Sequence, residues 1–219
     1  MKDAHRLYVH LLFGLLPLVT SVGCAISGPR IPDGWESRPA TPIDLKDGDQ
    51  ARLQIIVTYD LIGSHIVLRI TGPQRQLIMW DPAGQFGLDG HGVQRKRDVI
   101  FDGVPTLDEY WTYRQQLSGS VSHKFAIYEY DIVDRQADEL REPLFHETEL
   151  FRTKTGSARC GLAASEFLMR FAKPTVRVCE QRFMPHHMMD KLMVNDPPSR
   201  LILYCDGWIV PRVYEQIRR

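Results

Sequence analysis

Three residues whose types together support thiol chemistry are spread along the chain: His65, Asp81 and Cys160. A thiolate nucleophile needs a base that shares its proton, and the base needs a third group that fixes its orientation and tautomer. A cysteine at a helix start, a histidine on a strand and an aspartate on the next strand could form such a set. We therefore expect Cys160 to be a nucleophile, His65 its general base and Asp81 the group that orients His65.

A strand-turn-strand pattern positions the histidine and the aspartate. His65 opens one apolar run, Asp81 closes the next, and the segment Gly72–Arg75 between the two runs is a turn signal. A hairpin centred near Pro73 would place His65 opposite Asp81 to within one residue. Cross-strand neighbours lie close enough for a carboxylate to bind an imidazole ring.

A helical pattern begins around Cys160. Gly156 and Ser157 supply a turn and a cap, and large apolar residues then recur at helical spacing: Leu162, Phe167, Leu168 and Phe171. Cys160 would lie in the first turn of this helix, where unsatisfied N–H groups and the positive dipole end lower the pKa of a thiol. The alternative is a small buried cysteine with no chemical role.

Two other cysteines lie in strand-like runs. Cys179 and Cys205 could form a disulfide between neighbouring strands. Together with Cys160 they allow three pairings, so the connectivity stays open. In an oxidising compartment the odd count leaves one thiol over, either free or engaged in other chemistry.

The N-terminus has the features of an export signal. A basic start precedes an uncharged apolar run at residues 11–23, whereas a bilayer-spanning helix needs roughly 20 residues. Ser21–Cys24 resembles the lipobox of bacterial lipoproteins, in which the cysteine is acylated, for example with palmitate. We therefore expect residues 1–23 to be a signal peptide and Cys24 to carry a lipid anchor. The alternative is an ordinary signal peptide cut nearby, which would leave a soluble periplasmic protein.

The signal is followed by a tether and then by one domain. Residues 24–49 are rich in Pro, Gly and charge without an apolar period, which predicts a flexible spacer. No aspartate follows Cys24, and by resemblance to sorted lipoproteins this favours the outer membrane, facing the periplasm, within the bacterial cell envelope. Residues 50–219 are long enough to bury one core.

Composition argues against several classes of protein. Lys+Arg and Asp+Glu balance at 27 each, so no overall charge attracts nucleic acid. His186, His187 and Asp190 lie close in sequence, but no further ligand completes a tetrahedral metal set. We expect no metal and no cofactor.

A capping box marks a second helix. Thr106 and Glu109 have its spacing, and aromatic residues follow from Tyr110 onwards. Their face could pack in the core or contact a substrate.

The order of these elements resembles that of a known family. GSHIVLRI at residues 63–70, a second strand ending at Asp81, and a helix opening at Cys160 resemble the circularly permuted papain-like hydrolases of the NlpC type, in particular the YaeF/YiiX-like proteins. The resemblance covers residues 51–204. It implies an α+β fold in which the cysteine helix packs on an antiparallel sheet. Relatives place Ser-Glu directly after the cysteine, whereas here the next residues are Gly161 and Leu162.

The resemblance also implies a function. We expect an envelope-anchored thiol hydrolase, an amidase, peptidase or acyl-ester hydrolase that acts on cell-wall peptides or on acyl- or amide-linked molecules. An enzyme of this kind should expose Cys160 in a cleft, within hydrogen-bond reach of His65. The alternative is a non-catalytic lipoprotein that binds a ligand or protein partner. That alternative predicts a buried or disulfide-bonded Cys160, far from His65.

Overall fold

The computed structural model describes part of the chain, beginning at residue 29. The described residues are 29–60, 63–72, 74, 76–88, 92–117, 124–146, 159–173, 175–178, 185–205 and 208–216. The predicted signal peptide at residues 1–23, the lipid site Cys24 and the cysteine Cys179 lie outside them. In the part that is described, no helix combines the length and the apolar character needed to cross a bilayer.

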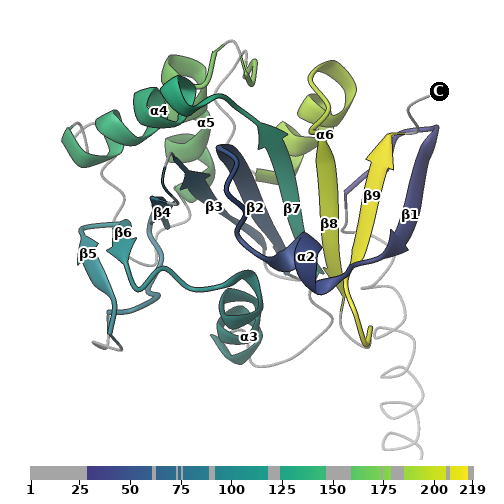
Figure 1. The fold of residues 1–219 in the computed structure, drawn as a ribbon, viewed down its shortest axis with the longest axis horizontal. Coiled ribbons are helices and arrows are strands. Elements are labelled where there is room, and N and C mark those ends of the chain that lie inside the picture. The colour runs from purple at the N-terminus through teal and green to yellow at the C-terminus, as the bar shows by residue number, and fades with distance from the viewer. Residues whose placement is uncertain are drawn as a thin grey trace, which may run out of the picture.

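The described chain is an α+β protein built on one antiparallel sheet (Figure 1). The strands are β1 (Trp35–Pro39), β2 (Arg52–Asp60), β3 (Gly63–Thr71), β4 (Leu77–Trp80), β5 (Gln94–Lys96), β6 (Val99–Asp102), β7 (Lys124–Asp131), β8 (Arg200–Cys205) and β9 (Arg212–Gln216). The helices are α2 (Pro42–Leu45), α3 (Leu107–Leu117), α4 (Asp134–His146), α5 (Cys160–Phe171) and α6 (Pro185–Asn195). The strand order is β1-β9-β8-β7-β2-β3-β4-β6-β5. The predicted antiparallel α+β architecture is confirmed.

Both faces of the central strand β2 are covered. Leu53, Ile55 and Val57 belong to one buried cluster, together with residues of α4, α5 and α6. Ile56 points to the other face, where α3 packs. Figure 1 shows the same division, with α4, α5 and α6 on one side of the sheet and α3 on the other. Because side chains alternate along a strand, the successive residues Ile55 and Ile56 are buried on opposite faces of the sheet.

The predicted tether at residues 24–49 is wrong from Trp35 onwards. Residues 35–39 form β1, which pairs along its length with the C-terminal strand β9. The side chain of Trp35 packs against the core. Asp44 of α2 is buried and holds Arg38 at 2.6 Å and Arg200 at 3.2 Å. The charges that suggested a solvated spacer instead fasten this segment to the sheet.

A buried carboxylate on β7 links neighbouring strands of the sheet. Glu129 is 1% exposed, accepts a hydrogen bond from Gln54 at 2.8 Å and pairs with Arg200 at 2.6 Å and Arg52 at 3.3 Å. Removing one member of such a network leaves its partners with uncompensated charge or polarity in the interior.

We expect Glu129→Ala to lower the free energy of unfolding by about 3–5 kcal/mol, because it removes the buried carboxylate that Arg200, Arg52 and Gln54 share. Denaturant unfolding of the full-length protein measures the change. The control is Glu139→Ala in the exposed pair with Arg135, which should cost less than about 1 kcal/mol. Equal losses for the two variants would contradict a special role for the buried network.

Candidate active site

The imidazole of His65 and the carboxylate of Asp81 are in direct contact. His65 Nε2 lies 2.6 Å from Asp81 Oδ1, and the Asp81 side chain is 1% exposed. His65 lies on β3, and Asp81 directly follows β4. The predicted contact between these two side chains is therefore present in the structure.

The predicted register of this hairpin is wrong, however. Thr71 pairs with Leu77, so the turn is centred on residue 74, and pairing ends where Leu68 meets Trp80. One further step in the same register would place Asp81 opposite Val67, two residues away from His65. Positions two residues apart on a strand share a face, so the side chains still meet diagonally.

Asp81 is enclosed by polar and charged groups from several elements. The Tyr110 hydroxyl on α3 donates a hydrogen bond to Asp81 Oδ1 at 3.3 Å. Arg114 of α3 and Arg95 of β5 add positive charge nearby. Burial raises the pKa of Asp81, but the hydrogen bond and charge of His65 outweigh it and lower the pKa below its usual value. Burial also raises the pKa of Tyr110, so its hydroxyl keeps its proton and acts as a donor.

Cys160 is the first residue of α5 and has a free thiol. The N-cap residue is Arg159, which makes no side-chain cap hydrogen bond. The turn and cap expected at Gly156 and Ser157 lie outside the described residues. The first N–H groups of a helix have no intrahelical acceptor. Here the N–H of Gly161 is bonded to the Cys160 sulfur.

The edge of β3 next to the end of β4 provides the other backbone contacts of Cys160. β4 pairs with β3 only as far as Leu68. Beyond this point the Cys160 sulfur lies 3.9 Å from the carbonyl oxygen of Ser64 and accepts a hydrogen bond from the N–H of Ile66. The start of α5 thus takes the place of a strand partner.

Cys160 and His65 are hydrogen-bonded to each other, and each changes the pKa of the other. Burial raises the pKa of Cys160, but the hydrogen bond and charge of His65 and the N–H groups of Ile66 and Gly161 lower it overall. Burial lowers the pKa of His65, but the hydrogen bonds to Asp81 and Cys160 raise it to about 9. Since Nε2 contacts Asp81, Nδ1 is the ring nitrogen left for the thiol. The arrangement therefore favours a thiolate beside an imidazolium.

Exposure of Cys160 in a cleft is not found. The residue is only 4% exposed, while the His65 side chain is 13% exposed. The expectation of an open thiol is wrong because the first turn of α5 lies directly against β3. The burial matches the expectation for a binding protein, and the contact with His65 matches the expectation for an enzyme.

Sequence reasoning missed several residues that complete this site. The capping box predicted at Thr106 and Glu109 is confirmed, since the two residues bind each other reciprocally and Glu109 N donates to Thr106 Oγ1 at 3.2 Å. Tyr110 follows in the same helix. No sequence signal indicated that its hydroxyl would reach Asp81. Ser64 was also missed: its hydroxyl lies 3.2 Å from Nδ1 of His186, the half-buried second residue of α6.

The sequence also raised a disulfide between Cys179 and Cys205 and a metal site at His186, His187 and Asp190. Cys205 ends β8 and is half-buried. Its proposed disulfide with Cys179 stays a prediction, since Cys179 lies outside the described residues. No group of three His, Cys, Asp or Glu side chains that could hold a metal occurs within the described ranges, so none forms around His186, His187 and Asp190 there.

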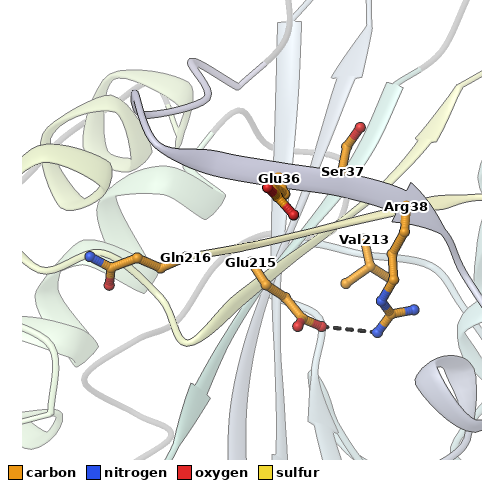
Figure 2. Close-up of a pocket in the computed structure, with 6 residues that line it drawn as sticks. All are labelled: Glu36, Ser37, Arg38, Val213, Glu215 and Gln216. Atoms are coloured by element: carbon orange, nitrogen blue, oxygen red, sulfur yellow. Dashed lines mark hydrogen bonds and ion pairs between the residues drawn. The ribbon is translucent and has the colours of Figure 1, made fainter. Parts of the chain in front are cut away.

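A pocket of about 180 Å³ lies on β1 and β9, at the opposite end of the strand order from β4 (Figure 2). An ion pair of 3.0 Å between Arg38 and Glu215 bridges the two strands there. None of the three candidate residues lines this pocket. Its lining residues are Glu36, Ser37, Arg38, Val213, Glu215 and Gln216.

Comparisons with protein-family models, curated proteins and solved structures find no match for this chain. Its class is thus defined by its architecture and side chains: an α+β protein in which a Cys-His-Asp set joins α5, β3 and the end of β4.

We expect alkylation of Cys160 by iodoacetamide to follow an apparent pKa below that of an ordinary cysteine thiol, because His65 lowers the pKa of Cys160. The ion pair should persist from that lowered pKa up to about pH 9, where His65 loses its proton. His65→Ala should raise the apparent pKa of Cys160, because burial then acts without the opposing positive charge. Mass spectrometry of the full-length protein in detergent locates the modified cysteine and gives the rate at each pH.

The control is His146→Ala, which changes an exposed histidine at the end of α4 and should leave the alkylation profile unchanged. An identical profile in the wild type and in His65→Ala would show that the two side chains do not share a proton.

Proposed function

We propose that this protein is a thiol hydrolase of the bacterial cell envelope, with Cys160 as nucleophile, His65 as general base and Asp81 as the residue that orients His65. One observation carries the proposal: Asp81 holds Nε2 of His65 at 2.6 Å while the imidazole is also hydrogen-bonded to the thiol of Cys160. The three residues come from separate elements, and Cys160 is the first residue of α5.

The fold we propose is a circularly permuted papain-like fold of the NlpC type. Its support is the order of the elements: the histidine strand β3 comes first, the aspartate after β4 second, and the cysteine helix α5 last. In papain the cysteine helix comes before the histidine strand. The packing of α5 on the sheet beside β3 agrees with this proposal.

The proposed reaction begins with attack of the Cys160 thiolate on the carbonyl carbon of an amide or ester. The carbonyl π electrons move to oxygen, and N–H groups at the start of α5 are placed to stabilise the oxyanion. The bond to the leaving amine or alcohol then breaks as the His65 imidazolium transfers its Nδ1 proton to the leaving group, and a thioester remains. His65 next takes a proton from water, the hydroxide oxygen adds to the thioester carbon, and cleavage of the C–S bond releases the acid.

Access to the sulfur is the physical requirement of this mechanism. Because Cys160 is 4% exposed, a carbonyl group can reach Sγ only if neighbouring side chains move apart. The substrates we propose are cell-wall peptides or acyl- and amide-linked envelope molecules, and the residues present require no cofactor for this chemistry.

Cys160→Ala should lower turnover at least about a thousandfold while leaving the fold intact, because no other group can form the thioester. The assay is mass spectrometry of muropeptides and of acyl- and amide-linked model substrates after incubation with the full-length protein. The matched control is Cys205→Ala, which changes a different cysteine, at the end of β8, and should retain activity. Equal turnover by the wild type and Cys160→Ala would disprove the assignment.

The burial of Cys160 favours a second candidate, a non-catalytic lipoprotein that binds a ligand or partner through the same fold. This candidate predicts no turnover by the wild type on any of these substrates. It also predicts that a bound ligand protects Cys160 from alkylation.

We also propose that residues 1–23 are removed and that a lipid on Cys24 anchors the protein to the outer membrane. Cys24→Ala should abolish incorporation of radiolabelled palmitate and move the protein from the membrane pellet to the soluble fraction. Cys160→Ala should keep both the label and the membrane location. Retained label in Cys24→Ala would exclude Cys24 as the acylated residue.

A further inference from the structure

A tight turn begins at Asp81. The N–H of Gly84 donates to the carbonyl of Asp81 at 2.9 Å, with Pro82 second in the turn and Ala83 third at a φ of 64°. Proline at the second position and a positive φ at the third are the pattern of a type II turn. Asp98 binds this turn twice, through its carbonyl to the N–H of Asp81 at 2.9 Å and through Oδ2 to the N–H of Ala83 at 3.3 Å.

The turn folds Gly84 directly beneath the carboxylate of Asp81. A Cβ atom built on Gly84 would lie 1.9 Å from both Cγ and Oδ2 of Asp81 and 2.0 Å from Oδ1. Non-bonded carbon atoms approach each other only to about 3.5–4.0 Å, so no side chain fits at position 84 while the carboxylate keeps its place. The φ of Gly84 is not among the left-handed values, so the restriction comes from space and not from backbone conformation.

Two hydrogen-bond donors, one on β3 and one on α3, hold the carboxylate of Asp81. Oδ1 receives hydrogen bonds from His65 and Tyr110, and Oδ2 is buried with no hydrogen-bond partner among the described residues. Tyr110 is itself fully buried and packs against Phe86 and Phe125. The carboxylate is thus bound on one oxygen only, and the close approach of Gly84 adds a steric limit to its position.

We infer that Gly84 is a positioning residue: the absence of its side chain lets the carboxylate of Asp81 lie against Nε2 of His65, where the Tyr110 hydroxyl also donates to it. This inference rests on the proposed function, because it concerns how the same Cys-His-Asp site is held together. A side chain at position 84 pushes the carboxylate away, and His65 then loses the anion that keeps it protonated. The thiolate of Cys160 in turn loses its cation.

The test is the pH profile of Cys160 alkylation by iodoacetamide in the full-length protein, measured for the wild type, Gly84→Ala, Asp81→Ala and the double variant. We expect Gly84→Ala to raise the apparent pKa of Cys160 by about one unit, which corresponds to about a tenfold slower reaction near neutral pH. We expect the double variant to match Asp81→Ala, because Gly84 acts only through the carboxylate. The control is Gly48→Ala, whose added Cβ would meet nothing closer than 3.8 Å.

Each outcome decides between clear alternatives. A wild-type profile with an ordinary, His65-independent pKa would disprove the proposed function itself. A lowered, His65-dependent pKa that Gly84→Ala leaves unchanged would disprove the role of Gly84 alone. If Gly84→Ala fails to fold, the double variant decides: recovery of folding supports a clash with the carboxylate, and equal failure shows that Gly84 acts independently of Asp81.

Discussion

The early end of the β3–β4 ladder is the constraint on which the rest of the site depends. Pairing stops at Leu68, and β3 continues for several residues without β4 beside it. The backbone groups of Ser64 and Ile66 on that edge are then available to Cys160 at the start of α5. The same ending lets the chain leave β4 in a tight turn, which carries Asp81 to His65. One interruption of strand pairing thus brings three segments of the chain together.

The charges of Asp81, His65 and Cys160 stabilise one another. Asp81 is ionised because His65 is positive, and His65 is positive because it lies between a carboxylate and a thiol that can ionise. Burial opposes every one of these charges taken singly. The set is stable as a group because each charge neutralises the next and because backbone N–H groups reach the sulfur. This mutual neutralisation allows the three side chains to be largely buried.

How far the sequence predicted this structure depended on whether a feature was local. The strand at β2, the helix beginning at Cys160 and the capping box at Thr106 follow from short patterns and are confirmed. The hairpin register failed by two residues, since a turn signal does not define how many residues the turn uses. The prediction of a tether was wrong because β1 pairs with β9, a strand far away in the sequence. The role of Gly84 could not be predicted from the sequence, because Gly84 meets the side chain of Asp81 only once the turn has formed.

The pairing of β1 with β9 has a consequence for how the protein is made. Every other strand of the described sheet can begin to pair as the chain emerges, but β1 has no neighbour until nearly the last described residues have been synthesised. Contacts between such distant parts of a chain close slowly, because a long loop must be ordered before the contact forms. Until then the first strand and the carboxylate of Asp44 remain open to chaperones and proteases, so the stability of the sheet depends on β9 arriving intact.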